Sequence, residues 1–288
     1  MATNRCTLPQ PTTDAGRAGL AALLGASEHA VVALDFDGTL APIVDDPDMA
    51  RADIRAVEAL ARLTPHLAAA VIVTGRPAAV AVEYGRFRGV PGLERLVVLG
   101  HYGLERWDAD TDRITAPEPP RGVHDARLAL PGLLQALDVW TTTWTEDKGS
   151  AVAVHTRRAP DPQATFDLLR GPLTDLAERH GLTVEPGRLV LELRPEGMDK
   201  GLALAAFLRE RKAASVLFAG DDLGDLAAFD AVETLRGQGV AGVTVCSGSG
   251  EVTALAERAD LVVPGPSGVA DLLAGLASAV VDPAPAAD

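Results

Sequence analysis

Five short apolar runs, each followed at once by a polar cluster, constrain the fold of this 288-residue chain more than any other feature. The runs are rich in Ala, Val, Leu and Ile, and they are too short for a membrane helix or an ordinary buried helix. Such runs are typical of strands that are buried on both faces of a parallel sheet. The predicted strands are residues 30–34, 69–73, 96–99, 215–219 and 261–263.

Helical patterns separate these predicted strands. Apolar residues recur at helical spacing within 54–61 and again within 204–211. Alternation of strand, polar loop and helix predicts an α/β fold with a doubly wound parallel sheet. Ligands of such sheets bind beyond the carboxyl ends of the strands. We therefore expect the polar clusters to meet in space, although they span most of the chain.

The middle third of the chain has a different pattern. Antiparallel strands joined by hairpin connections, with a helix containing Phe166 and Leu169 among them, predict an α+β unit. The predicted strands of this unit are residues 140–145, 151–156, 182–185 and 189–193. We expect an inserted domain over 117–194, within a core formed by 1–116 and 195–288. Residues 1–12 are predicted to be disordered.

Composition and charge exclude several classes of protein. The net charge of −14 argues against nucleic acid as a partner, because phosphate contacts need clustered Lys and Arg. No run approaches the ~18 apolar residues of a membrane helix, and residues 1–9 lack the pattern of a signal peptide. The two cysteines, Cys6 and Cys246, make no disulfide framework. We expect a cytoplasmic protein with no nucleic-acid or membrane partner, and we expect a monomer.

The clearest chemical signal directly follows the first predicted strand, at Asp35, Asp37, Gly38 and Thr39. Carboxylates at positions i and i+2 of an extended chain point the same way. Gly38 and Thr39 are expected to offer backbone N–H groups to an anion. Two acids beside an anion site are consistent with a divalent cation between them. An acidic strand end that caps the next turn is the alternative.

Three further motifs follow in order along the chain. They are 74–76 (Thr-Gly-Arg), the pair Lys200 and Gly201, and 220–225, which contains three aspartates. With 35–39, this ordered set resembles the four motifs of the haloacid dehalogenase superfamily.

Further motifs narrow the resemblance to the trehalose-6-phosphate phosphatase family, over roughly residues 30–275. They are residues 37–43, Asp46 with Pro47, Glu146 through Gly149, His155, Arg157, and Glu192 through Pro195 before Lys200. The inserted domain resembles that family's cap domain.

The resemblance implies a phosphatase with a covalent aspartyl-phosphate intermediate, which divides a very slow hydrolysis into two displacements. Asp35 would be the nucleophile, and Asp37 would protonate the leaving sugar oxygen and then activate water. Mg²⁺ would be held by Asp35, the backbone carbonyl of Asp37, and Asp221. Asp222 and Asp225 would support the ion or act as lesser ligands; an acid favouring a helix N-terminus is the alternative for Asp225. The phosphate-binding candidates are Gly38, Thr39, Thr74, Gly75, Arg76 and Lys200.

The same resemblance assigns candidates for contact with the sugar. They are His101, or its neighbour Tyr102, and Glu105 in the core, with Glu146, Lys148, His155, Arg157 and Glu192 in the inserted domain. A hairpin turn at 146–149 and a structural His155 are the alternatives.

The implied reaction is hydrolysis of trehalose 6-phosphate, the final step of trehalose biosynthesis, with Mg²⁺ as cofactor and a small sugar phosphate as partner. A phosphatase for another phosphosugar and a non-catalytic sugar-phosphate-binding protein remain alternatives. The core motifs alone also fit a phosphomutase.

Overall fold

The chain forms two compact units, each with its own sheet. The computed structural model describes residues 8–44, 46–118, 121–187, 189–248 and 253–282. One unit comprises Met1–Ala116 and Asp199–Asp288, and the other comprises Pro117–Met198.

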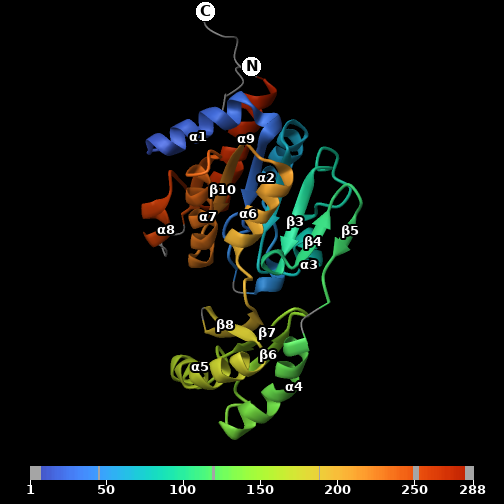
Figure 1. Ribbon diagram of the computed structural model, residues 1–288, viewed down its shortest axis with the longest axis vertical. Helices are drawn as coiled ribbons and strands as arrows, with labels where there is room; N and C mark the ends of the chain where they lie inside the picture. The colour runs from blue at the N-terminus through green and yellow to red at the C-terminus, as the bar shows by residue number, and fades with distance from the viewer. Residues whose placement is uncertain (1–7, 45, 119–120, 188, 249–252, 283–288) are drawn as a thin grey trace, which may run out of the picture. The chain divides into compact units, whose positions relative to one another are not determined.

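An eight-stranded sheet forms the centre of the larger unit, in the order β12-β11-β10-β1-β2-β3-β4-β5 (Figure 1). Strands β12 through β3 of this order are parallel, and β4 and β5 add an antiparallel edge. The strands are β1 (Ala30–Leu34), β2 (Ala69–Val73), β3 (Leu96–Gly100), β4 (Glu105–Asp108), β5 (Arg113–Thr115), β10 (Ser215–Gly220), β11 (Ala241–Ser247) and β12 (Leu261–Val263).

All five predicted core strands are present in this sheet. Strands β1, β2 and β12 have the predicted ends, and β3 and β10 each extend one residue further. The α/β fold class with a doubly wound sheet is thereby confirmed. Strands β4 and β5 were not predicted, because both are short, β4 has three charged residues among its four, and β5 is exposed at the edge of the sheet.

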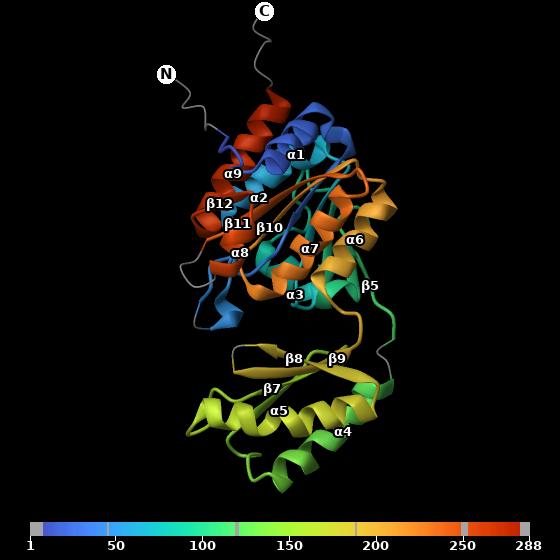
Figure 2. The ribbon, with the colours of Figure 1, turned by 60° about the vertical axis from the view of Figure 1, so that its left-hand side comes forward.

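Helices cover both faces of the sheet (Figure 2). Alternate residues of β1 divide between two apolar cores: Val32 and Leu34 pack in one, and Val31 and Ala33 in the other. The first core receives α1 (Asp14–Gly25), α2 (Ile54–Leu63), α3 (Ala78–Gly85) and α9 (Gly265–Val281), and the second receives α6 (Lys200–Arg211), α7 (Leu226–Arg236) and α8 (Thr253–Arg258). Single 3-10 turns are η1 (Ser27–His29), η2 (Pro47–Met49), η3 (Thr64–His66), η4 (His101–Gly103) and η5 (Leu223–Asp225).

The smaller unit has an antiparallel sheet of four strands in the order β6-β7-β9-β8. Its strands are β6 (Trp144–Asp147), β7 (Val152–His155), β8 (Leu182–Gly187) and β9 (Val190–Pro195). Helices α4 (Arg121–Ala136) and α5 (Pro162–Arg179) pack their apolar sides with Val152, Val154, Leu191 and Leu193 into one core. The other face of this sheet carries polar residues, since side chains alternate along each strand.

Three local predictions differ from the structure. The strand predicted at 140–145 begins only at Trp144, because the Thr142 and Thr143 amides turn back onto the Val139 carbonyl. Ile54, which begins the apolar pattern predicted within 54–61, is 58% exposed and lies off the buried face of α2. Residues 8–12 are placed, so the prediction of disorder is wrong for them: the amide and hydroxyl of Thr12 both donate to the Asp260 carbonyl. Residues 1–7 lie outside the described part of the chain.

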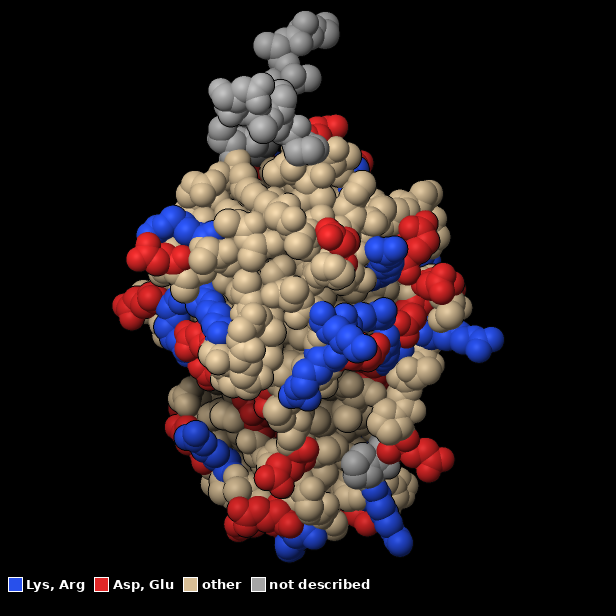
Figure 3. All heavy atoms as spheres, turned by 45° about the horizontal axis from the view of Figure 1, so that its top comes forward, with Lys and Arg blue, Asp and Glu red and all other residues tan. Residues whose placement is uncertain are grey.

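Charges of both signs occur on the face of the molecule that Figure 3 shows. On the face shown in Figure 3, Lys and Arg side chains lie next to Asp and Glu side chains. Within the described residues, no helix combines the length and apolar character that a bilayer crossing requires.

Candidate active site

Four parallel strands of the larger unit end side by side. β1 lies between β10 and β2, and β3 follows β2. Asp35 follows β1, Thr74 follows β2, and Asp221 follows β10. The Asp35 amide donates to the Ala219 carbonyl over 2.9 Å, so the pairing with β10 continues into the first residue after β1. Loops far apart in the sequence therefore share one edge of the sheet.

Lys200 lies among the acids of these loops. Its Nζ lies 2.8 Å from Asp35 Oδ1 and 2.8 Å from Asp225 Oδ1, with Asp222 Oδ1 at 3.9 Å. Lys200 is the first residue of α6, directly after Asp199, whose side chain caps the helix. Lys200, Asp35 and Asp225 are all buried, so the ammonium group is fixed against the Asp35 carboxylate.

Asp225 organises the loop after β10. Its Oδ2 accepts the amides of Asp221 and Asp222 at 2.9 and 3.1 Å, while Oδ1 accepts Lys200. Asp225 has no exposed surface, whereas the Asp222 side chain is 60% exposed. Both carboxylate oxygens of Asp225 thus hold the turn and Lys200. The Asp222 side chain lies at the exposed edge of this cluster.

Burial and crowding shift the pKa values of this cluster. Burial raises the pKa of Asp35 well above its usual value, and Lys200 only partly opposes the shift. Burial, with Asp225 and Asp222 nearby, raises the pKa of Asp221 to about 7. Burial alone would lower the pKa of Lys200, but Asp225 and Asp35 outweigh it and raise that pKa, so Lys200 stays charged. One ammonium group does not offset the surrounding carboxylates.

The donor set fits a divalent cation. Asp35, Asp221 and Asp225 each offer one carboxylate oxygen, and these oxygens lie within 4.8 Å of one another. Oxygen donors are the ligands that Mg²⁺ prefers, and a cation would relieve the repulsion that raises the pKa values of Asp35 and Asp221. The absence of a side chain at Gly38 leaves room for the Asp221 carboxylate. A methyl group on the Gly38 Cα would overlap that carboxylate, and the φ of +72° also favours glycine at this position.

The loop after β1 is closed by its own hydrogen bonds. The Gly38 amide, which we expected to offer to an anion, donates instead to the Ala41 carbonyl over 2.7 Å. The Ser247 hydroxyl, at the end of β11, donates to the Gly38 carbonyl over 2.7 Å. Thr39 is fully buried, and its hydroxyl has no partner among the described residues. The Thr39 hydroxyl is therefore a buried side-chain group of this loop that could still donate to a ligand.

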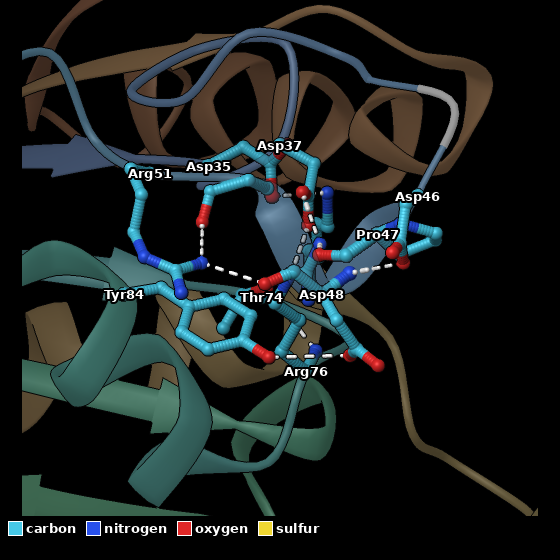
Figure 4. A network of polar contacts seen from close by, with 11 residues as sticks. Asp35, Asp37, Asp46, Pro47, Asp48, Arg51, Thr74, Arg76 and Tyr84 are labelled. Atoms are coloured by element: carbon cyan, nitrogen blue, oxygen red, sulfur yellow. Dashed lines mark hydrogen bonds and ion pairs between the residues drawn. The ribbon is translucent and has the colours of Figure 1, made fainter.

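Arg76, from the loop after β2, binds Asp37 through two parallel hydrogen bonds (Figure 4). Its Nε and Nη2 each lie 2.7 Å from a carboxylate oxygen of Asp37, and Nη2 also donates to the Pro47 carbonyl over 3.0 Å. The Arg76 amide donates to the Thr74 hydroxyl over 3.1 Å, which ties the two residues of this loop together. Arg76 is thus engaged with Asp37, whose side chain is 40% exposed.

The loop after β3 supports the loop that carries Thr74 and Arg76. The amides of His101 and Tyr102 donate to the carbonyls of Arg76 and Thr74, both over 2.9 Å. His101 is buried, with its Nδ1 3.1 Å from Glu105 Oε1. Burial would raise the pKa of Glu105, but hydrogen bonds from His101 and the Ala78 amide outweigh it and lower that pKa. His101 and Glu105 therefore hold the loop that carries Thr74 and Arg76. Tyr102 lies against Gly75 of the same loop.

The polar face of the smaller sheet brings together three of the predicted sugar contacts. Glu146 lies opposite Ala153, which lies opposite Glu192, and Trp144 lies opposite His155. Glu146 Oε2 lies 2.9 Å from His155 Nε2, and Lys148 pairs with Glu192. Arg157 follows β7 and is exposed.

Comparison with known proteins identifies the family. The sequence model of the trehalose-phosphatase family matches residues 33–264. The chain belongs to the trehalose-phosphatase family.

Individual members of the trehalose-phosphatase family are similar to this chain over much of its length. A trehalose-phosphate phosphatase of Mycobacterium avium is 35% identical over 237 residues, 76% of this chain and 55% of that protein. A probable trehalose-phosphate phosphatase of Sinorhizobium fredii is 33% identical over 217 residues, 71% of this chain and 74% of that protein. The chain thus spans about half the length of the mycobacterial relative.

A solved structure shares the fold. The C-terminal domain of C. albicans trehalose-6-phosphate phosphatase superposes with a TM-score of 0.72 at 20% identity, over 96% of this chain and 99% of that domain.

Several polar partners in this trehalose-phosphatase family member carry no sequence motif. Tyr84 lies beside Arg76, and Arg51 lies over the Tyr84 ring. Arg194 pairs with Glu185 over 2.7 Å on the polar face of the smaller sheet. Glu192 and Arg194 are two residues apart on one strand, so the sequence could have indicated that Arg194 shares the sheet face of Glu192. No pattern in the sequence links Tyr84 to Arg76.

Proposed function

We propose that this chain hydrolyses trehalose 6-phosphate to trehalose and phosphate. The observation that carries the proposal is the buried Asp35 carboxylate, held beside Lys200 and Asp221 at the strand ends of a member of the trehalose-phosphatase family. Asp37, two residues on and more exposed, supplies a second carboxylate beside it. This pairing provides a nucleophile and a proton carrier within one loop.

In the first displacement, an Asp35 oxygen attacks phosphorus and the bond from phosphorus to the sugar oxygen breaks. Asp37 donates its proton to that sugar oxygen, so that trehalose leaves as an alcohol rather than an alkoxide. Lys200 remains charged and balances the negative charge on the transferring group. Thr39 and Thr74 supply hydroxyls for phosphate oxygens.

In the second displacement, water attacks phosphorus of the aspartyl-phosphate and the bond to the Asp35 oxygen breaks. Asp37, now ionised, takes a proton from that water, and Asp35 is restored as phosphate leaves. The two-point contact with Arg76 fixes the direction of the Asp37 carboxylate for both proton transfers.

Asp35, Asp221 and the backbone carbonyl of Asp37 would hold Mg²⁺, with Asp225 anchoring the turn that carries Asp221. When bound, the ion neutralises phosphate charge and positions the phosphoryl group.

Selection of the disaccharide is assigned to polar side chains that can bind hydroxyls. In the smaller unit these are Glu146, Lys148, His155, Arg157 and Glu192. Glu146, His155 and Glu192 share one sheet face, which supports this assignment. His101 and Glu105 act on the core side as braces rather than as direct contacts, and Tyr102 is the more accessible neighbour.

The test is phosphate release from a panel of trehalose 6-phosphate, glucose 6-phosphate, sucrose 6-phosphate and p-nitrophenyl phosphate, with and without EDTA. Trehalose 6-phosphate should give the highest kcat/KM, EDTA should abolish turnover, and added Mg²⁺ should restore it. A higher kcat/KM for another sugar phosphate would reject trehalose 6-phosphate as the substrate but would leave the proposed phosphatase mechanism in place. If the protein bound members of the panel but hydrolysed none of them, the assignment as an enzyme would be rejected.

A further inference from the structure

The structure places a supporting layer behind Arg76, made by the segment 46–51 and by Tyr84 of α3 (Figure 4). Arg76 is long and flexible, yet its two hydrogen bonds to Asp37 require one orientation of the guanidinium plane. Two aromatic rings lie close to that plane. Its central carbon is 5.2 Å from the centre of the Tyr84 ring and 5.8 Å from that of Phe36.

Tyr84 is itself held by the segment 46–51. The Tyr84 hydroxyl lies 3.2 Å from Asp48 Oδ1. The backbone carbonyl of Tyr84 accepts the amide of Ala52, the residue directly after this segment, over 3.2 Å. A second guanidinium, that of Arg51, lies over the same ring at 4.2 Å and donates to the carbonyl of Asp48 over 2.7 Å. Partial burial and the bond to Asp48 raise the pKa of Tyr84, so the phenol stays protonated as the donor.

These contacts close a circuit. Arg76 donates to the carbonyl of Pro47, Pro47 precedes Asp48, Asp48 accepts the Tyr84 hydroxyl, and the Tyr84 ring lies against Arg76. Of the four residues in this circuit, only Arg76 belongs to the four sequence motifs. Tyr84 is the member of this circuit that contacts both Arg76 and the segment 46–51.

We propose that Tyr84, held by Asp48 and Arg51, is a positioning residue that fixes Arg76 and thereby directs the Asp37 carboxylate toward the leaving oxygen. The proposal rests on the proposed function, in which Asp37 protonates that oxygen. Guanidinium groups over aromatic faces are attracted to the ring electrons, so the ring limits the positions open to Arg76. Misplacement of a reacting group by about 1 Å can cost ~10²-fold in rate.

The leaving group distinguishes this role from a merely structural one. p-Nitrophenolate leaves readily without a proton, whereas a sugar or alkyl alkoxide needs one. Tyr84→Leu should therefore lower kcat for trehalose 6-phosphate by about ten- to a hundredfold, within the ~10²–10⁴-fold range of general acid catalysis. Its kcat for p-nitrophenyl phosphate should fall less than about threefold, and KM for both substrates should change little.

Two further variants test the links separately. Tyr84→Phe keeps the ring and loses only the bond to Asp48, so it should show a smaller loss with the same leaving-group dependence. Arg51→Leu removes the second cation from the ring, and Arg55→Leu, four residues on and exposed with its own partner Asp53, is the matched control. Arg55→Leu should leave both substrates unaffected. Thermal unfolding of each variant reports whether the fold is retained.

A readout without turnover keeps the two proposals separable. The Nε–H signal of Arg76 in ¹H–¹⁵N spectra, assigned by its disappearance in Arg76→Lys, should broaden or shift in Tyr84→Leu and not in Arg55→Leu. An unchanged Arg76 signal, or equal loss of kcat on both substrates, overturns the role of Tyr84. If the wild type hydrolyses p-nitrophenyl phosphate but no trehalose 6-phosphate, the proposed substrate fails, and alkyl phosphates take its place in the leaving-group comparison.

Discussion

At the scale of single residues, the two acids after β1 differ in environment. Asp35 is buried against Lys200, whereas Asp37 is half-exposed and bound by Arg76. A buried carboxylate next to a fixed ammonium suits a nucleophile, and an accessible one suits proton transfer with a departing alcohol. These positions support the proposed division of roles between Asp35 and Asp37.

We expect Asp35→Asn to lower kcat by at least about a thousandfold without unfolding the protein, because an amide cannot form the acyl phosphate. Asp37→Asn should slow hydrolysis of alkyl phosphates far more than that of p-nitrophenyl phosphate, the same pattern as that expected for Tyr84→Leu. Phosphate release and circular dichroism provide the measurements. Wild-type kcat in Asp35→Asn, once deamidation is excluded by mass spectrometry, would refute the covalent step.

At the scale of elements, the parallel sheet explains how much could be predicted. Strands β1, β2, β3 and β10 are buried on both faces, so their sequences are unbroken apolar runs, and the loops after them are where ligands bind. Strands β4 and β5, at the antiparallel end of the sheet, lack this pattern. The partner of Arg76 could not be predicted, since the contact with Asp37 joins two loops whose side-chain directions only the fold determines.

The polar face of the smaller sheet leads to a prediction about selectivity. Glu146→Ala and Glu192→Ala should each lower kcat/KM for trehalose 6-phosphate by about tenfold or more, because a lost hydrogen bond to a charged group costs ~1.5–3 kcal/mol. Hydrolysis of p-nitrophenyl phosphate should be largely spared. Asp167→Ala, on the exposed side of α5, is the control. Equal losses on both substrates would assign these glutamates to the stability of the sheet.

At the scale of the whole molecule, the crowded acids would couple the proposed cation binding to the stability of the fold. Without a cation, the raised pKa of Asp221 means that the folded state binds its proton more tightly than the unfolded chain does. That contribution to stability is complete below the unfolded pKa of 3.8 and is lost as pH rises through about 7. A divalent cation bound by these carboxylates would replace the proton.

The increase in Tm on adding Mg²⁺ should therefore be larger at pH 8 than at pH 6, and binding should release protons near pH 6. Differential scanning calorimetry at both pH values measures the first effect, and calorimetric titration in buffers of different ionisation enthalpy measures the second. Asp221→Asn should remove most of the Mg²⁺-induced shift. A Mg²⁺ effect on Tm that is independent of pH would contradict the assignment.

The place where the chain returns to the larger unit has a consequence for length variation. The boundary follows Met198, Asp199 caps α6, and Lys200 is already the first helical residue, so no spare residue separates the boundary from the ammonium group beside Asp35. The outward boundary, after Ala116, follows the exposed edge strand β5. Two glycines inserted after Met198 should reduce kcat sharply, while the same insertion after Ala116 should be tolerated. Natural length differences among relatives should accordingly accumulate at the outward connection and be rare at the return, a bias that a comparison of homologous chains would reveal.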